Sequence, residues 1–389
     1  MTKFLKITIK KFENDSRDLR ELQIAKNLGA EVIIMSKGNI SNIKSLIEGF
    51  IVYTYSTKLL RDNRLFLHFN KFISIFRWSY YARKHKPDII SAHNIIPLLI
   101  GWLSNFCRIK KAILIYDSHE FELGTFSNTQ KSRVYLFFLE KLEKFLIRKC
   151  ALTIMVNDSI ASEVFRIHKL KIKPLVVRNL ANYWHIDKSE VNRIRTYYKQ
   201  LLCIGDDTLM ALYHGALNEV KGIENFIKAL AITPQTVGIL IGQGSDTYIR
   251  KLNNLIKDYK IDSKVLLLDA VPYKELYKYV AASDVGIIVP KPISQNHMYA
   301  LPNKFFENIQ ALNPIICSNL PEMKKIISEF NIGLLCDPEN IKSISNAMIE
   351  MRENRNLYSI FKSNLLRAKD ELCWERESEI LKKIYTTLI

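Results

Sequence analysis

A strand-like run at 209–214 leads into a segment whose residue types suit the binding of phosphate. The segment LYHGALNEVKGIENFIKAL (212–230) places Gly215 at the end of the strand and Lys221 and Gly222 at the start of an amphipathic helix. Glycine allows close backbone approach, a helix N-terminus offers free N–H groups, and lysine adds positive charge. The pattern indicates a phosphate cradle. The alternative is an ordinary turn between strand and helix with a solvated lysine.

A second glycine pair follows the next strand-like run. ILIGQGSD (239–246) places Gly242 and Gly244 directly after that run. A single G-x-G is common in the turns of α/β proteins, so this pair decides little without its neighbours.

The segment NHMYALPNKFFENIQAL (296–312) carries the most specific signal in the chain. A helix is expected to begin near Pro302 and Asn303, with Lys304 and Glu307 in its first turns. A helix N-terminus attracts a pyrophosphate, and a carboxylate one turn along can accept hydrogen bonds from ribose hydroxyls. The alternative for Glu307 is a solvent-facing residue that favours the helix dipole.

Two series of short apolar runs, separated by helical patterns, must position these residues. Each series contains about six runs rich in β-branched residues: 5–10, 31–35, 50–54, 88–92, 112–116, 152–155 and 174–178 in the first half, and 209–214, 237–241, 264–268, 284–289, 314–317 and 333–336 in the second. Nearly continuous apolar strands that alternate with helices indicate parallel sheets covered on both faces. The sequence therefore predicts two doubly wound α/β domains, with ligands beyond the carboxyl ends of the strands.

Positive charge is concentrated in the first half of the chain. Residues 1–180 contain 31 Lys and Arg against 15 Asp and Glu, whereas residues 181–389 contain 26 against 24. A basic half joined to a neutral half suggests an anionic partner for the first half, such as nucleic acid, an acidic glycan or an anionic membrane leaflet. No nucleic-acid-binding motif accompanies the charge, which disfavours the first of these partners.

Two basic stretches of the first half also carry many aromatic residues. The segment 58–86 interleaves Phe, Trp and Tyr with Arg and Lys, and the helical segment 130–149 carries a wide apolar stripe with basic flanks. Both patterns fit a helix that lies on a membrane surface. The alternative is that the apolar faces pack on the first sheet, and one helix can do both.

Composition and the N-terminus favour a cytoplasmic protein. MTKFLKITIKKF alternates apolar and charged residues, no apolar run is long enough for a membrane span, and the six cysteines are scattered. We therefore expect reduced thiols and a cytoplasmic location, with peripheral contact to the inner face of the cytoplasmic membrane.

The order of motifs in the second half resembles the donor domain of glycosyltransferase family 4, the glycosyl transferases group 1. Over about residues 209–345 the chain reads G-x-L-x-x-x-K-G, G-x-G, V-P-x-x-E-L, A-x-S-D-V-G-I, L-P-N-K-F-F-E-N and N-P-I-I-C-S. The closing W-E-R-E and ILKKIY are similar to the C-terminal helix of that fold, which crosses back onto the first domain. Looser similarity in the first half rests on DIISAHN (88–94), YDSHE (116–120), LTIMVNDSIA (152–161) and VVRNLAN (176–182).

The resemblance implies the GT-B fold, in which two Rossmann-like domains face each other across a cleft. The implied N-terminal acceptor domain spans 1–182, the nucleotide-sugar donor domain 183–368, and the returning C-terminal helix 369–389. The implied activity is transfer of a sugar, with retention of configuration, from a nucleotide diphosphate to a glycan or lipid-linked glycan in surface polysaccharide assembly. UDP is favoured over GDP as the carrier.

The resemblance also assigns roles to individual residues. Lys221 would hold the donor diphosphate, and the amides near Pro302, Asn303 and Lys304 would cap it. Glu307 would bind the ribose, the loop at Val271 and Pro272 would lie beside the base, and His119 would lie near the anomeric carbon. The remaining expected site residues are Gly215 and Gly242 on the donor side and His93, Asn94 and Glu120 on the acceptor side.

The expected chemistry is stabilisation of the leaving diphosphate by Lys221, Lys304 and a helix N-terminus. No D-x-D motif is convincingly placed, so neither a metal nor another cofactor is expected. His119 is expected to be catalytic, although a lone histidine is more often structural.

Two positions depart from the family pattern. Ala216 stands where a basic pair R-x-x-x-x-K commonly has its arginine, and Tyr299 stands where many members carry a second glutamate. These departures keep open a non-catalytic protein of this fold that binds an anionic membrane or glycan. A sugar-nucleotide epimerase or a phosphorylase of this fold is also an alternative, but the carboxylates or the pyridoxal phosphate lysine that they need are not evident.

Overall fold

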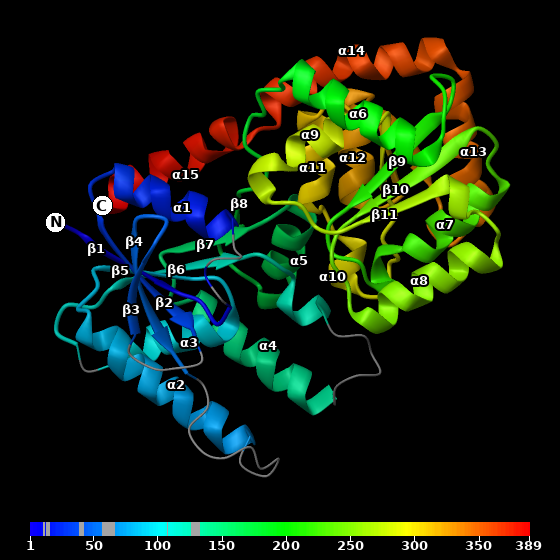
Figure 1. Cartoon of the computed structure of the whole chain (residues 1–389). Helices are drawn as coiled ribbons and strands as arrows, with labels where there is room; N and C mark the ends of the chain where they lie inside the picture. Colours follow the sequence, from blue (N-terminus) through cyan, green and yellow to red (C-terminus); the bar gives the residue numbers. More distant parts are fainter. Residues whose placement is uncertain (11, 13–15, 39–42, 57–66, 107, 126–132) are drawn as a thin grey trace. The chain divides into compact units, whose positions relative to one another are not determined.

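The chain divides into two compact units, each built around its own sheet (Figure 1). The structure, a computed structural model, describes residues 1–10, 12, 16–38, 43–56, 67–106, 108–125 and 133–389. Unit 1 comprises Met1–Arg178 and Ser378–Ile389, and unit 2 comprises Asn179–Glu377. The sequence places the first junction four residues later, after residue 182.

Unit 1 contains an eight-stranded sheet in the order β3-β4-β2-β1-β5-β6-β7-β8. The strand bounds are β1 Lys3–Ile7, β2 Glu31–Lys37, β3 Ile43–Ile47, β4 Phe50–Tyr55, β5 Ile89–Ala92, β6 Ile113–Ser118, β7 Leu152–Met155 and β8 Leu175–Val176. All neighbouring strands pair in parallel except β3 and β4. The doubly wound α/β class expected from the sequence is therefore confirmed in this unit.

The antiparallel edge strand β3 has no counterpart in the sequence prediction. Its residues are mostly exposed, and it pairs only with β4. The two strands are joined by a tight turn in which both Glu48 (φ 49°) and Gly49 (φ 78°) adopt left-handed backbone angles. Such a two-residue turn matches the twist of a hairpin. The half-polar run IKSLI lacks the continuous apolar character by which the buried strands were recognised.

Helices cover both faces of the unit 1 sheet. In Figure 1, α2, α3 and α4 lie on one side of the sheet, whereas α1 and α15 lie on the other. The bounds are α1 Ser16–Asn27, α2 Leu67–Lys84, α3 Ile95–Ser104, α4 Arg133–Ile147 and α5 Asp158–His168, with a 3₁₀ turn η3 at Glu122–Thr125. The predicted helical stretch 130–149 is thus confirmed over α4. Residues 58–66 and 130–132 of the two aromatic stretches lie outside the described residues.

The C-terminal helix α15 (Trp374–Leu388) runs from unit 2 into unit 1. In unit 1 the ring of Tyr385 packs against Phe4 of β1, with 5.5 Å between ring centroids, and its hydroxyl donates to Glu21 of α1 at 2.5 Å. The Thr2 hydroxyl donates to the Ile389 carbonyl at 2.8 Å. The returning helix expected from the closing W-E-R-E segment is therefore present.

Unit 2 contains a six-stranded, fully parallel sheet in the order β11-β10-β9-β12-β13-β14. The strand bounds are β9 Leu209–His214, β10 Thr236–Ile241, β11 Val265–Leu268, β12 Val285–Ile288, β13 Ile315–Ser318 and β14 Gly333–Cys336. Every residue of β9, β10, β12 and β13 is buried. Strands covered on both faces produce the continuous apolar runs seen in the sequence.

Two groups of helices cover the unit 2 sheet. The bounds are α6 Lys188–Leu202, α7 Ile223–Ile232, α8 Asp246–Asp258, α9 Leu276–Ala281, α10 Gln295–Met298, α11 Asn303–Gln310, α12 Pro321–Phe330, α13 Ile341–Glu353 and α14 Arg355–Glu371, with 3₁₀ turns η4 Glu219–Lys221, η5 Asp262–Lys264 and η6 Tyr273–Glu275. Helix α7 contacts α8 and α13, while α11 contacts α9 and α14. The second α/β domain is thus confirmed as a helix–sheet–helix sandwich.

Two further expectations concern membranes and cysteines. Among the described residues, every helix is too short or too polar to cross a bilayer. Cys150, Cys203, Cys317, Cys336 and Cys373 are free thiols, and Cys107 lies outside the described residues.

We predict that Tyr385→Phe weakens unit 1, because it removes the hydroxyl that donates to the buried Glu21 carboxylate. The expected loss is roughly 1–3 kcal/mol, the usual effect of removing a hydrogen bond to a charged group. Native-state hydrogen exchange of the β1 and α1 amides measures it. Tyr259→Phe, which removes a hydroxyl from an exposed tyrosine of unit 2, is the control. Equal exchange in both variants would contradict the prediction.

Candidate functional site

The candidate site of unit 2 lies where the direction of strand succession reverses, between β9 and β12. Ligands of doubly wound sheets bind beyond the carboxyl ends of the strands at this point. The chain leaves β9 through His214, Gly215 and Ala216, and enters α7 through η4 and Gly222. Lys221 ends η4 directly before the helix.

Two glycines let the backbone pass close to itself at this edge. A β-carbon at Gly222, whose φ is 74°, would lie 2.0 Å from the carbonyl oxygen of Val289 after β12. A β-carbon at Gly242 would lie 1.9 Å from the carbonyl oxygen of Gly215. No side chain fits at either position without moving the backbone. The glycines thus set the path of the loop that carries Lys221.

Helix α11 brings Glu307 to the end of β9. The side chain of Glu307 is almost fully buried, and its Oε2 lies 2.7 Å from Nε2 of His214. This contact joins the last residue of β9 to the second turn of α11 and fixes the position of the carboxylate. His214 was not singled out in the sequence; its place directly before Gly215, at the end of a buried strand, was the available signal.

The first turn of α11 also brings Lys304 beside the β9 loop. Its Nζ lies 3.5 Å from the centroid of the Tyr213 ring, and a β-carbon at Gly215 would lie 3.3 Å from the same nitrogen. Burial, and then the nearby Lys221, hold the pKa of Lys304 well below its ordinary value of 10.5, although Glu307 acts in the opposite direction.

The structure therefore brings most of the predicted donor-side residues together in unit 2. Tyr213, Lys221, Pro302 and Lys304 line one small cavity, together with Ile288, Val289, Pro290, His297 and Ala300. Gly215, Gly242 and Glu307 adjoin it through the contacts described above. Asn303, the first residue of α11, is exposed, and so is Ala216. The sequence did not single out Tyr213 or His297.

Unit 1 contains a buried charged cluster at the carboxyl end of β1. The Nζ of Lys6, fully buried in β1, lies 2.8 Å from Oδ1 of Asp18, contacts Glu21, and donates to Ser91 in β5 at 3.2 Å. Burial alone would lower the pKa of Lys6, but Asp18 and Glu21 raise it above its ordinary value. The lysine is thus held as a cation between two carboxylates.

A second ion pair extends this cluster to His119. Arg17 donates from Nη2 to Oδ1 of Asp117 at 2.7 Å, and His119 Nε2 lies 3.3 Å from the other carboxylate oxygen. Burial would raise the pKa of Asp117, but Arg17 and His119 hold it well below its ordinary value. Within this charged cluster, the side chain of His119 is 12% exposed. The second carboxylate near it is that of Asp18, with 3.7 Å between His119 Nε2 and Oδ1.

The expected acceptor-side residues separate into different environments. His93 is fully buried, its Nδ1 lies 3.9 Å from Asp18, and its ring lies 5.3 Å from that of His119. Asn94, at the start of α3, donates to the carboxylate of Glu122. Glu120 is exposed, and only its carbonyl contacts the Ser118 hydroxyl, at 2.7 Å.

Glu122, in η3 after β6, was not recognised in the sequence. Burial raises its pKa from 4.5 to about 7, despite the hydrogen bond from Asn94, and Glu143 and Glu120 add to the increase. It therefore adds a carboxyl group that titrates near neutral pH to the edge that holds His93 and His119.

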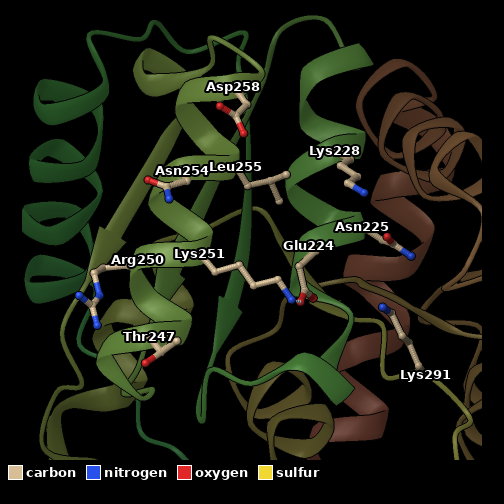
Figure 2. Close-up of a pocket in the computed structure, with 10 residues that line it drawn as sticks. All are labelled: Glu224, Asn225, Lys228, Thr247, Arg250, Lys251, Asn254, Leu255, Asp258 and Lys291. Atoms are coloured by element: carbon tan, nitrogen blue, oxygen red, sulfur yellow. Dashed lines mark ion pairs between the residues drawn. The ribbon is translucent and has the colours of Figure 1, made fainter.

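A larger hollow of unit 2 lies elsewhere, between α7 and α8 (Figure 2). This groove of about 680 Å³ is lined by Glu224, Asn225, Lys228, Thr247, Arg250, Lys251, Asn254, Leu255, Asp258 and Lys291. Lys251 points across it toward Glu224, with 3.2 Å between Nζ and Oε1. None of the residues predicted to bind a ligand lines the groove.

Among the described residues, no group of three or more His, Cys, Asp or Glu side chains is arranged to hold a metal ion.

The second unit matches a known protein family. Residues 198–366 match the family model of Glycosyl transferases group 1. The chain is 25% identical to an uncharacterized glycosyltransferase of Methanocaldococcus jannaschii over 67% of this chain and 65% of that protein. It is 20% identical to the O-antigen chain mannosyltransferase RfbU of Salmonella typhimurium over 73% of this chain and 70% of that protein. The chain thus spans just under two thirds of the first of these relatives.

Solved structures match the whole chain. The Anabaena protein HepE in complex with UDP-glucose superposes with a TM-score of 0.76 at 16% identity, over 100% of both chains. Residues 198–366 therefore resemble the glycosyl transferases group 1 family, and the chain has the fold of GT-B glycosyltransferases, with two Rossmann-like units. The resemblance seen in the motifs of residues 209–345 is confirmed.

We predict that Glu122→Gln flattens the pH dependence of stability of unit 1. The raised pKa of Glu122 means that the folded state holds an extra proton between pH 4.5 and about 7. The stabilisation that this proton gives the folded state is fully present below pH 4.5, and it is lost as pH rises through about 7. The variant should therefore be more stable than the wild type at pH 8, by roughly 2–3 kcal/mol at most.

Thermal unfolding between pH 5 and 8 measures this difference. Glu120→Gln is the control, since Glu120 is a neighbouring but exposed carboxylate. Parallel stability curves for the wild type and Glu122→Gln would refute the assignment of the buried acid.

Proposed function

We propose that this chain is a glycosyltransferase that takes a sugar from a nucleotide diphosphate carrier, UDP rather than GDP, and retains its anomeric configuration. The observation that carries the proposal is the meeting of Lys221, Lys304 and Glu307 at the β9–β12 edge, inside the segment that matches the group 1 family model. The binding of UDP-glucose by the structurally similar HepE supports a UDP carrier.

The proposed chemistry follows from the charges at this edge. When the bond between sugar and phosphate breaks, negative charge builds on the leaving diphosphate. Lys221 and Lys304, together with the N-terminal amides of α7 and α11, supply positive charge for it. These groups are proposed to act in place of a metal ion, and neither a metal nor another cofactor is assigned to the site.

Glu307 and the loop after β11 are proposed to hold the nucleoside. The carboxylate of Glu307 would accept hydrogen bonds from the ribose hydroxyls, and His214 would keep it in place through their 2.7 Å contact. The loop at Val271 and Pro272, between β11 and η6, would lie beside the base.

His119 is proposed as the polar group of unit 1 nearest the reacting carbon. It is partly exposed at the carboxyl end of β6 and is held by Asp117 and Asp18. Asn94 and Glu120 are proposed to contact the acceptor, and His93 is proposed to act on it indirectly. His93 in particular is fully buried, so its proposed effect passes through His119.

The acceptor is proposed to be a glycan or lipid-linked glycan of surface polysaccharide assembly, reached at an anionic membrane. The similarity to an O-antigen chain mannosyltransferase supports this class of acceptor. Helix α4 buries Leu139 and Leu146 but exposes an aromatic face, which we define as Val134, Phe137, Phe138 and Phe145. Lys141 lies 5.0 Å from the Phe137 ring centroid, and Lys149 lies 5.5 Å from that of Phe145.

Helix α2 carries a similar exposed stripe, Phe72, Phe76 and Tyr80, at four-residue spacing. Apolar rings flanked by lysines suit the boundary between lipid headgroups and acyl chains. The alternative that these helices pack on the sheet holds for part of each helix, and the exposed rings remain for the membrane.

We predict that Lys221→Ala and Glu307→Ala each weaken UDP binding at least tenfold. Lys221→Ala removes a charge at the proposed diphosphate position, and Glu307→Ala removes the proposed ribose acceptor. Isothermal titration calorimetry with UDP, GDP, ADP and CMP measures affinity and selectivity.

Lys228→Ala and Glu339→Ala, which remove side chains outside the proposed site, should leave binding unchanged. His119→Ala should retain UDP binding but lose hydrolysis or transfer of the donor sugar. The absence of binding to any of the four nucleotides would instead favour a non-catalytic protein of this fold.

We predict that Phe137→Ser combined with Phe138→Ser lowers binding to anionic vesicles by tenfold or more. Each exposed phenylalanine that enters the membrane contributes about 1.5–3 kcal/mol. Co-sedimentation with phosphatidylglycerol vesicles at low salt measures the effect, with phosphatidylcholine vesicles as the lipid control. Tyr259→Ser, on an exposed tyrosine of unit 2, is the protein control. Equal sedimentation of the two variants would exclude the aromatic face as the contact.

A further inference from the structure

The amine of Lys304 is buried without a hydrogen-bond partner in the part of the chain that the structure describes. The amine lies over the face of the Tyr213 ring, 3.5 Å from Nζ to the centroid. Buried polar atoms in proteins are nearly always paired, and a buried ammonium group needs an anion or several acceptors. An amine in this state indicates a ligand group that the free protein lacks.

The charges around Lys304 do not compensate it. Glu307 is the nearest acid, but its Oε2 already lies 2.7 Å from His214. Lys221, which lines the same cavity, adds a second positive charge. Burial and Lys221 accordingly depress the pKa of Lys304 in the free protein. The partnerless amine of Lys304, with Lys221 lining the same cavity, thus forms a local site for an anion in the described part of the chain.

The amine of Lys304 lies close to Ala216, the position where the family pattern commonly has an arginine. A β-carbon at Gly215 would lie 3.3 Å from the Lys304 Nζ, so the amine reaches the chain directly beside Ala216. The Ala216 carbonyl accepts the Tyr213 hydroxyl at 2.8 Å, which ties the loop to the same ring that Lys304 covers. Lys304 thus reaches, from α11, the chain one residue before Ala216.

We propose that Lys304 is the second diphosphate-binding cation of this site, in place of the basic side chain absent at Ala216, and that it takes up a proton when the donor binds. The inference rests on the proposed function, because it presumes a diphosphate at the β9–β12 edge. The proton comes from solvent and binds Nζ, so the amine enters the complex as an ammonium ion and no covalent bond of the donor changes in this step.

Proton uptake has a consequence for the pH dependence of binding. The titratable groups around the amine are Lys221 from η4, His214 and Tyr213 from β9, His297 from α10, and Glu307 from α11 itself. A bound diphosphate favours the charged form of Lys304 and raises its pKa. The affinity for the diphosphate should therefore fall as pH rises through the pKa of Lys304 in the complex, because binding takes up a proton and the proton concentration is then lower.

The test is calorimetric titration of the full chain with UDP at pH 8.0, in Tris and in HEPES. The two buffers differ in ionisation enthalpy, so the difference in observed heat gives the number of protons taken up. The terminal phosphate has its second pKa near 6 and is fully ionised at this pH, so it contributes little to the count. We expect net proton uptake for the wild type, and none for Lys304→Met together with at least tenfold weaker binding.

A second variant separates the loss of charge from damage to the fold. Lys304→Met with Ala216→Arg places a permanently charged guanidinium beside the site, because arginine stays protonated in proteins. It should regain most of the lost affinity without proton uptake. Lys304→Met alone should unfold at the same or a higher temperature than the wild type, since it removes an unpartnered buried amine.

The possible outcomes are distinct. Wild-type binding of UDP without proton uptake would overturn the inference while leaving the donor site intact. Uptake that persists in Lys304→Met would assign the proton to another group, with His297 the first to examine, and would equally overturn it. If the wild type binds neither UDP nor GDP, the proposed function itself fails, and this inference fails with it.

Discussion

The donor-side edge of unit 2 depends on two close passages of the backbone. Gly242 lies against the carbonyl of Gly215, and Gly222 lies against the carbonyl of Val289, so the loops after β9, β10 and β12 are fixed to one another without intervening side chains. This contact determines where η4 ends and where α7 begins, and therefore where Lys221 stands. Parallel pairing of β9 with β10 and β12 supplies the shared edge, and glycine supplies the space. An alanine at either glycine would separate the loops and displace the lysine.

Buried cations are paired with carboxylates in unit 1, whereas the buried amine of Lys304 in unit 2 is not. In unit 1, Lys6 and Arg17 are each matched by carboxylates within a direct hydrogen bond, so their charges are permanent and structural. In unit 2, Lys304 has a ring face and a second lysine beside it, and the adjacent carboxylate is engaged by a histidine. A compensated cluster stabilises a rigid framework, whereas an uncompensated amine stores unfavourable energy that a bound anion can release. The contrast separates residues that hold the fold from residues that await a ligand.

The sequence predicted the frame well because buried parallel strands have an unambiguous pattern. All six strands of unit 2 were expected within one residue of their bounds, whereas β3 was missed because an exposed edge strand with alternating polar residues carries little apolar signal. Lys221, Lys304 and Glu307 were recognised because they stand in motifs that follow one another in the order of the family pattern. The contacts of His214 with Glu307 and of Lys6 with Ser91 were not, since they join residues 93 and 85 positions apart and depend on the register of strands and helices. Local patterns reveal which residues carry chemistry, while the pairing of buried charges emerges only from the three-dimensional fold.

The contact between His214 and Glu307 has a role beyond holding a carboxylate in place. If Glu307 were turned toward Lys304 instead, the two would form a buried ion pair, and the lysine would be charged and occupied before any ligand arrived. The 2.7 Å contact with the end of β9 keeps the carboxylate on the histidine side and leaves the amine to an incoming anion. The same contact keeps a hydrogen-bond acceptor next to, but apart from, the cations. One histidine thus divides the edge into a cationic part suited to phosphate and an acidic part suited to hydroxyl groups.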